Sequence, residues 1–183
     1  MTVEQLGNPS VTDVVLETGR LLLREMVHDD FQALFEIFSD EETMSFYPKP
    51  FDRDKVNSWI EWNRTSYREN GYGLWTVLHK ESGTVIGDCG LIRQIVDGIV
   101  EVEIGYHTNK KFWGEGYATE AALACRDYAF NSLGVSRVIS LIRPENSPSR
   151  RVAEKNGMTV EKETIKSDYL HYVYTCKAPK GGT

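Results

Sequence analysis

The chain has 183 residues, of which 40% are hydrophobic and 26% charged, and its formal net charge is −6 at pH 7. A chain of this length and composition has room for one well-buried core and is short for two ordinary domains. We therefore expect a single domain over residues 1–183. The negative charge repels nucleic acids and anionic membrane surfaces at long range, so neither is expected as a direct partner.

Cysteine usage and the start of the chain bear on the compartment. Cys89, Cys125 and Cys176 are odd in number and include no CxxC pair, which favours a reducing compartment over a disulfide framework. The first twenty residues lack a basic start followed by an apolar stretch, so we expect no signal peptide. No segment approaches the roughly 20 apolar residues that cross a bilayer. These features favour a cytoplasmic protein.

The first half of the chain predicts two helices and several strands after a loose arm over residues 1–12. Asp29 or Asp30 is expected to cap a short helix that ends near residue 40. Asp52 is expected to cap a second helix that runs to about residue 70 and stops at Gly71. The expected strands cover residues 21–26, 74–79, 84–92 and 99–106, with tight turns at Gly83 and at Asp97-Gly98.

The second half predicts two further helices and three strands, followed by a flexible tail over residues 178–183. A stripe of small residues on residues 117–132 lets a helix lie close against a sheet before Gly134 ends it. Ser147 is expected to cap a short helix with Pro148 at its first position. The expected strands cover residues 137–142, 159–164 and 169–177. Seven strands and four helices in this order predict a mixed α/β domain.

Gly114-Glu115-Gly116 lies between an expected strand and the start of the helix at Tyr117. Two glycines at a helix start let the backbone approach an anion, and the unpaired N–H groups of the first turn bind its charge. The sequence contains neither the GxxxxGK[ST] phosphate loop nor GxGxxG, which argues against nucleotide hydrolysis and hydride transfer. The alternative is that these glycines only form a turn.

Lys111-Phe112-Trp113-Gly114-Glu115-Gly116 resembles the pyrophosphate loop of the GNAT superfamily of acetyltransferases, which reads Q/R-x-x-G-x-G/A. Here lysine stands at the first position of that motif. Further segments are similar to the Rim-type branch, named for enzymes that acetylate α-amino groups of ribosomal proteins. These segments are Thr18-Gly19-Arg20-Leu21-Leu22-Leu23-Arg24, Glu103-Ile104-Gly105-Tyr106, Asn146-Ser147-Pro148-Ser149 and Glu154-Lys155-Asn156-Gly157-Met158. The resemblance covers residues 16–177.

The resemblance implies an α/β (α+β) fold of the GNAT type. Its mixed, mostly antiparallel sheet of seven strands would be splayed between the fourth and fifth strands, with about four helices packed on both faces. Backbone groups of Gly105, Tyr106 and His107 would be free in the opened seam to pair with the pantetheine arm of acetyl-CoA, which imitates a missing strand. An N–H group there would also stabilise the oxyanion of the reaction.

The resemblance also implies the residues that bind acetyl-CoA as the cosubstrate. The expected pyrophosphate loop consists of Lys111, Phe112, Trp113, Gly114, Glu115, Gly116, Tyr117, Ala118 and Thr119. Asn146 is expected to hold the pantetheine or to shape the turn. Coenzyme A brings about four negative charges, so local positive charge has to compensate for them. The candidates are Lys110, Lys111, Arg143, Arg150 and Arg151, each of which has an ordinary surface role as its alternative.

Two residues are candidates for proton transfer. Glu103 lies on the strand that would face the thioester and is the candidate base, with Glu101 as the second choice; a carboxylate on a solvated strand face is the alternative. Ser149 occupies the N-x-x-S position, where it would protonate the departing thiolate, although serines at helix starts commonly bond locally. Many GNAT enzymes place a tyrosine where this chain has Ala153, which favours Ser149.

The acceptor is an amine, and the Rim-type resemblance favours the N-terminal α-amine of a protein. A small-molecule amine is the second possibility, and a non-catalytic sensor that binds acyl-CoA is the third. Phe31, Phe35 and Trp59, with Glu101, are candidates for an acceptor pocket, and core packing is the alternative for the aromatic rings. The four histidines form no i,i+4 pair, and no Cys/His cluster exists, so we expect no metal. The oligomeric state is open, a homodimer included.

Overall fold

The computed structural model describes residues 14–180, so the predicted arm over residues 1–12 and the end of the predicted tail lie outside the described residues. The helices are α1 Phe31–Phe38, α2 Arg53–Asn70, α3 Tyr117–Asn131 and α4 Ser147–Lys155, with short 3-10 turns at His28–Asp30 and Lys110–Phe112. The strands are β1 Val14–Glu17, β2 Leu21–Arg24, β3 Leu74–His79, β4 Val85–Val96, β5 Ile99–Thr108, β6 Arg137–Ile142, β7 Thr159–Lys166 and β8 Tyr169–Lys177.

The strands form one sheet in the order β1-β2-β3-β4-β5-β6-β8-β7. Every neighbouring pair is antiparallel except β5 and β6, which are parallel and share a single register pair, Glu103 with Ile139. The predicted mixed sheet, splayed between these two strands, is therefore confirmed. The predicted number of seven strands is wrong, because Val14–Glu17 adds an eighth at the edge, paired with β2. Four residues are too few to show a clear periodicity.

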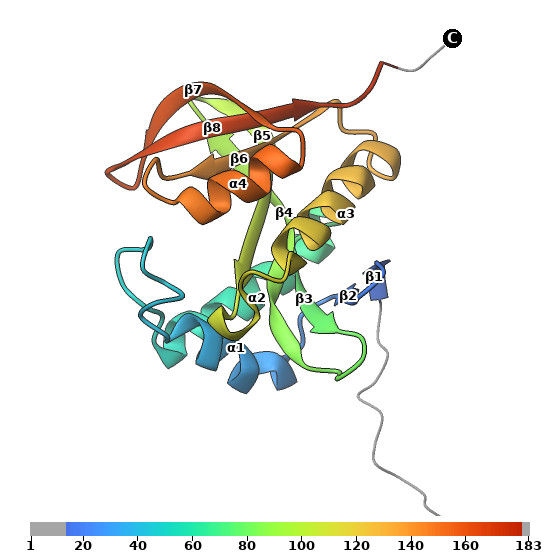
Figure 1. The fold of residues 1–183 in the computed structure, drawn as a ribbon, viewed down its shortest axis with the longest axis vertical. Helices are drawn as coiled ribbons and strands as arrows, with labels where there is room; N and C mark the ends of the chain where they lie inside the picture. The colour runs from blue at the N-terminus through green and yellow to red at the C-terminus, as the bar shows by residue number, and fades with distance from the viewer. Residues whose placement is uncertain (1–13, 181–183) are drawn as a thin grey trace, which may run out of the picture.

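Helices cover both faces of the sheet, as predicted (Figure 1). On one face, α1 and α2 bury Phe38, Val56 and Ile60 against Leu74 of β3. On the other face, α3 and α4 pack over the sheet, and the small side chains of α3, such as Ala122, let that helix lie close to it. Among the described residues, no helix combines the length and apolarity needed to span a bilayer.

Local signals for the helix ends have mixed outcomes. Asp52 caps α2 by accepting a hydrogen bond from the Lys55 N–H group at 2.8 Å, and Gly71 ends that helix with a left-handed φ of 77°, as predicted. Asp30 makes no cap hydrogen bond to α1, because its carboxylate is buried against Arg24 instead. Ser147 is the first residue of α4 and not its cap. Asn146 takes that place and accepts from the Ser149 N–H group at 3.2 Å.

The β4–β5 hairpin sets which side chains share a face near the opened seam. A side chain at Gly105 would meet Leu74 and Ile92, which belong to the α1/α2 side of the sheet. Side chains alternate along a strand, so Glu103 and His107 lie on that same side, whereas Tyr106 packs into the core beneath α3. Glu103 and His107 therefore lie on either side of Gly105, where an added Cβ atom would come within 2.9 Å of the Ile92 side chain.

Candidate active site

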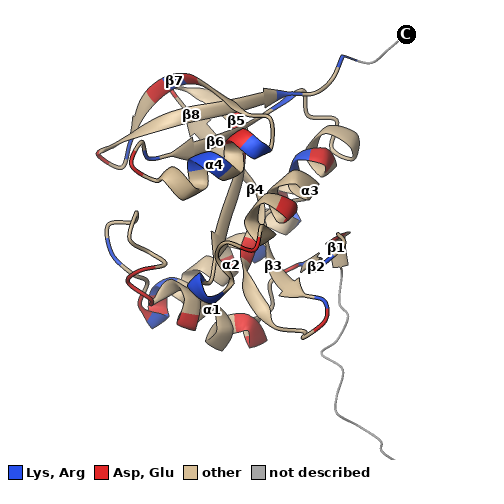
Figure 2. Ribbon diagram, in the orientation of Figure 1, with Lys and Arg blue, Asp and Glu red and all other residues tan. Residues whose placement is uncertain are grey.

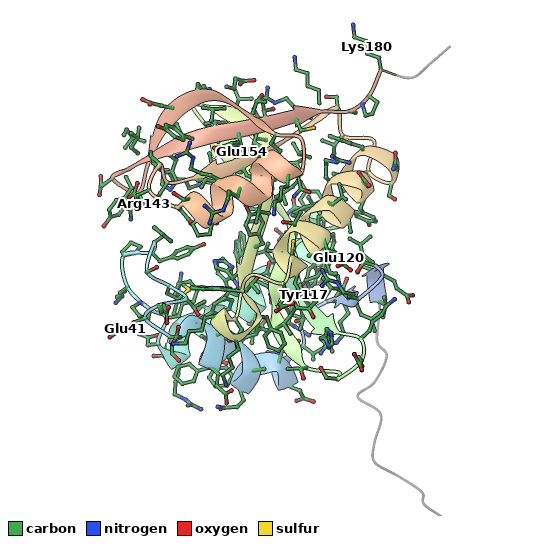
Figure 3. The ribbon with its side chains drawn as sticks, viewed as in Figure 1. Glu41, Tyr117, Glu120, Arg143, Glu154 and Lys180 are labelled. Atoms are coloured by element: carbon green, nitrogen blue, oxygen red, sulfur yellow. The ribbon has the colours of Figure 1, made fainter. Side chains whose placement is uncertain are left out.

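A cavity of about 500 Å³ lies among the start of α3, the first turns of α4 and the loop between α1 and α2. In Figure 1 that loop faces α4, and Figure 3 shows Tyr117 at the near end of α3, with Glu41 on the loop. The cavity is lined by Glu42, Thr43, Ser45, Phe46, Tyr47, Tyr106, His107, Thr108, Phe112, Trp113, Gly114, Gly116, Tyr117, Ala118, Thr119, Asn146, Pro148, Ser149, Arg151, Val152 and Lys155. It therefore brings together most of the residues that the sequence assigns to acetyl-CoA.

The glycine loop has the backbone that an anion site needs. Gly114 and Gly116 have φ angles of 79° and 81°, in the left-handed region that favours glycine. The first helical hydrogen bond of α3 runs from the Glu120 N–H group to the Gly116 carbonyl, at 3.0 Å. The N–H groups of residues 117–119 consequently precede the helical ladder and lie at the positive end of a 15-residue helix. These residues fit a diphosphate group.

Arg20 holds this loop from the far side. Its guanidinium donates to the Glu115 carbonyl at 2.9 Å and to the Glu120 carboxylate at 2.7 Å, and it stacks over the Tyr117 ring at 4.3 Å. Figure 3 shows Tyr117 and Glu120 together at the start of α3. No local pattern predicts this contact, because Arg20 lies 95 residues before the loop carbonyl that it binds.

The C-terminal half of β5 has a strand on only one of its sides. Gly105, Tyr106 and His107 pair with β4, whereas the single register pair with β6 lies further back, at Glu103. Neighbouring residues of an antiparallel strand turn their N–H and C=O groups to alternate sides, and the His107 carbonyl faces Gly87 of β4. The outward groups are therefore those of Tyr106, which can pair with an extended ligand. Tyr106 and His107 line the cavity, and Gly105 does not.

Glu103 is buried at the point where the seam opens. Its two carboxylate oxygens accept hydrogen bonds from Gln94 Nε2 at 2.8 Å and from the Leu141 N–H group at 3.3 Å. Burial raises the pKa of Glu103, although both hydrogen bonds oppose the shift. Its side chain does not line the cavity. Glu101 is held differently, since Arg137 binds both of its carboxylate oxygens, at 2.8 and 3.1 Å.

Ser149 and Asn146 line the cavity together from the start of α4. The Asn146 side chain accepts from the Ser149 N–H group, and the Ser149 carbonyl accepts from the Tyr106 hydroxyl at 2.8 Å. These two contacts fix the start of α4 to the opened strand. Ala153 is buried one turn further along the helix.

The aromatic residues suggested for the acceptor do not line the cavity. Phe31 and Phe35 stack on each other at 5.8 Å beneath the Arg53 guanidinium. Trp59 points towards β4 and donates to Asp88 at 2.9 Å. The wall on this side is instead formed by the loop between α1 and α2, with Phe46 and Tyr47 among its residues. This loop has no periodic pattern, so its place in the cavity wall was not predicted from the sequence.

The basic residues are divided between the cavity and structural contacts. Lys110 binds Asp40 at 2.7 Å, and this hydrogen bond lowers the pKa of Asp40 to about 2. Arg143 and Arg150 are engaged by neighbouring acceptors, and Lys111 is exposed outside the cavity wall. Of the five expected cations only Arg151 lines the cavity, joined by Lys155, which was not expected. Figure 2 shows basic residues on α4.

No group of three or more His, Cys, Asp or Glu side chains within residues 14–180 is arranged to hold a metal ion. The cavity wall carries backbone N–H groups, hydroxyls, the carboxylate of Glu42 and the imidazole of His107. Together with the splayed sheet and the glycine loop, these groups define an acyltransferase site. Residues 20–159 match the family described as the Acetyltransferase (GNAT) domain. The chain belongs to this family, whose members use acetyl-CoA.

Relatives and solved structures agree with this assignment. The uncharacterized protein YkkB of Bacillus subtilis is 37% identical over 164 residues, which are 89% of this chain and 95% of YkkB. FsC-acetyl coenzyme A-N(2)-transacetylase of Aspergillus fumigatus is 30% identical over 155 residues, 79% of this chain and 64% of the relative. A crystal structure of an acetyltransferase from Agrobacterium tumefaciens has a TM-score of 0.79 at 29% identity, covering 89% of this chain and 94% of its own.

Rim-type enzymes share the fold at lower identity. RimJ of Mycobacterium smegmatis, solved in complex with CoA-disulfide, has a TM-score of 0.69 at 21% identity and covers 86% of this chain and 82% of its own. This similarity supports the fold and not a particular acceptor.

Proposed function

We propose that the protein transfers acetyl from acetyl-CoA to a primary amine by direct attack within a ternary complex, with the N-terminal α-amine of a protein as acceptor. The observation that carries the proposal is the loop with two left-handed glycines, which lines the same cavity as the open side of β5. A diphosphate at the loop and an extended arm along the strand fit this arrangement.

Bound acetyl-CoA supplies a thioester carbonyl that an amine can attack. Backbone N–H groups of residues 117–119 and the side chains of Arg151 and Lys155 balance the charge of its phosphates. The open backbone of Tyr106 holds the arm and offers an N–H group to the oxyanion. Because each part of acetyl-CoA has its own site, the loop between α1 and α2 is the part of the cavity wall that remains for the acceptor.

Glu103 is proposed as a base that acts through water, since its side chain lies behind the cavity wall. Its raised pKa strengthens it as a proton acceptor once it is ionised. Glu101 is the weaker candidate because Arg137 occupies both of its oxygens. Ser149, on the cavity wall, is proposed to give a proton to the departing thiolate, with Asn146 fixing its backbone.

An N-terminal α-amine needs little help from a base. With a pKa near 8, roughly a tenth of such an amine is neutral at pH 7, against well under a thousandth for a lysine side chain. A small-molecule amine is the second candidate, and it is favoured by the Aspergillus fumigatus relative, whose name describes N(2)-transacetylation. We also propose a cytoplasmic location on the strength of the sequence, and a homodimer stays a prediction.

A thiol-release assay tests the function. Acetyl-CoA is offered with N-terminal peptides, polyamines, amino acids and aminoglycosides, and the acceptor class follows from the highest kcat/KM. Glu103→Gln and Ser149→Ala should each lower kcat by about 10²-fold, whereas Glu163→Gln on the exposed face of β7 serves as the matched control. Acetyl-CoA binding without turnover of any amine would indicate a sensor. Wild-type rates in both variants would remove the proposed roles of Glu103 and Ser149.

A further inference from the structure

Three side chains from different elements form a hydrogen-bonded chain beneath the acceptor side of the cavity. His107 Nδ1 lies 2.7 Å from Asp88 Oδ1, and the Trp59 indole N–H group donates to Asp88 Oδ2 at 2.9 Å. Asp88 and His107 are direct cross-strand partners in the β4–β5 hairpin, and Trp59 reaches them from α2. A base oriented by a carboxylate that is itself held in place is a recurrent arrangement for proton transfer.

The second nitrogen of His107 has no partner within the part of the chain that the structure describes. The His107 side chain is 8% exposed and Asp88 is fully buried, yet His107 Nε2 makes no hydrogen bond within the described part of the chain. Buried polar atoms are nearly always satisfied, so an unpaired one is a candidate for a functional contact. An ionised carboxylate only accepts hydrogen bonds, which places the imidazole hydrogen on Nδ1 and leaves the lone pair on Nε2.

His107 lines the cavity at its acceptor end. The rings of Phe38 and Trp59 pack edge-on against it from α1 and α2, at 5.2 and 5.8 Å, and Tyr47 covers it at 5.1 Å. Of these three rings only Tyr47 lines the cavity, and it is 40% exposed on its loop. A shift of this one side chain would open the imidazole to a ligand.

We propose that His107 Nε2, oriented by Asp88, takes the first proton from the acceptor ammonium group, which makes His107 a catalytic residue and Asp88 a positioning residue. The inference rests on the proposed function and deepens it. The ammonium group transfers one proton to Nε2, and the neutral amine then attacks the thioester carbon. The C–N bond forms and the C–S bond breaks, the nitrogen gives up a second proton, and the thiolate gains one. The net release is one proton to solvent.

The two proposed proton acceptors, His107 and Glu103, are placed differently relative to the cavity. Glu103 does not line the cavity and its oxygens are already engaged, whereas His107 lines the cavity and its buried Nε2 has no partner among residues 14–180. The ionisable groups that face the imidazole are Asp88 in direct contact, Glu103 on the same face of β5 and the hydroxyl of Tyr47. Among the described residues, the helices contribute the rings of Phe38 and Trp59, so Asp88 is the carboxylate in direct contact with the imidazole.

Asp88→Asn tests the tautomer without removing bulk. The Trp59 N–H group requires the amide oxygen of Asn, so the amide NH2 turns towards His107 and forces Nδ1 to accept. The hydrogen then moves to Nε2, which can no longer take a proton. We expect kcat to fall by about 10²-fold with an unchanged Kd for acetyl-CoA. The double variant Trp59→Phe/Asp88→Asn frees the amide to turn round and should recover much of the lost rate.

The measurements separate this proposal from the function beneath it. Nitrogen-15 NMR of the labelled imidazoles, assigned with His107→Asn, should show a bare Nε2 in the wild type and a protonated Nε2 in Asp88→Asn. In kinetics, His107→Asn should lose about 10²-fold in kcat and part of the acid limb of the pH profile, while the control His28→Asn, an exposed residue, loses neither.

Three results would overturn the proposal: a protonated Nε2 in the neutral wild-type ring, a kcat for His107→Asn within about threefold of the wild type, or a double variant slower than Asp88→Asn. Failure of the wild type to acetylate any amine would instead defeat the proposed function, and this step with it. If a variant fails to fold, the NMR result on the wild-type protein still decides the tautomer.

Discussion

Replacing Gly114 by alanine should weaken acetyl-CoA binding far more than it weakens the fold. Gly114 has a φ of 79° and Gly71 a φ of 77°, and at both positions an added Cβ meets no atom within 4 Å. The penalty for either alanine therefore comes from the left-handed backbone alone, about 1–2 kcal/mol. For a chain of 183 residues, each kcal/mol lowers Tm by about 2–4 °C. The two variants should lose similar stability.

Binding should distinguish them. Gly114 lines the cavity, whereas Gly71 ends α2 and lies outside the cavity wall. A methyl group at Gly114 occupies space that a phosphate would approach, and relaxation of the strained backbone would turn the neighbouring N–H groups away. Loss of one such contact should weaken binding at least about tenfold, or about 1.4 kcal/mol.

Isothermal titration calorimetry with acetyl-CoA measures the Kd, and thermal unfolding without ligand measures the stability. We expect Gly114→Ala to lose affinity and Gly71→Ala to keep the wild-type Kd, at matched decreases in Tm. Equal Kd values for the two variants would refute the placement of the diphosphate at this loop. A greater loss of affinity in Gly71→Ala would show that strain spreads through the fold.

Three further predictions follow from buried or paired charges. Arg24 donates to both carboxylate oxygens of Asp30, at 2.6 and 2.8 Å, and Asp30→Ala leaves its buried guanidinium without this partner. The free energy of unfolding, measured with urea, should fall by about 3–5 kcal/mol. A decrease below about 1 kcal/mol would contradict this expectation. Lys110→Met should return the pKa of Asp40 from about 2 towards its ordinary value, which carboxyl NMR measures. In the wild type, the stabilisation by this pair is lost as pH falls from the ordinary pKa of an aspartate to about 2. Burial raises the pKa of Glu103, so the unfolded chain ionises first and stability falls as pH rises above about 4.3. Glu103→Gln should lack this fall.

The features predicted well from the sequence depend on neighbours in the chain. The cap at Asp52, the stop at Gly71 and the turn at Asp97-Gly98 are set by a few adjacent residues, and all three have the predicted form. The glycine loop before α3 is equally local, so its place between a strand and a helix was predictable as well.

Contacts between distant segments carry no such local signal. Aspartate is a residue type that commonly caps helices. The Asp30 carboxylate nevertheless binds the buried Arg24 guanidinium, which is a stronger partner than a backbone N–H group. Arg20 supports the glycine loop from the start of β2, three strands away from β5 in the sheet, and the loop between α1 and α2 is held by the contact of Asp40 with Lys110. Each of these contacts depends on how the elements pack, which periodicity does not specify.

The Asp88–His107 pair lies between these two cases, because the hairpin turn already determines it. A two-residue turn at Asp97-Gly98 fixes the register of both strands, so Val96 pairs with Ile99, and the residues eight positions further out, Asp88 and His107, must also face each other. A carboxylate opposite an imidazole could thus be read from the sequence. The sequence does not predict the contact of Trp59, which lies on α2 and donates a hydrogen bond to the Asp88 carboxylate. The local register makes the pair, and the tertiary contact from Trp59 fixes the orientation of the carboxylate that binds the imidazole.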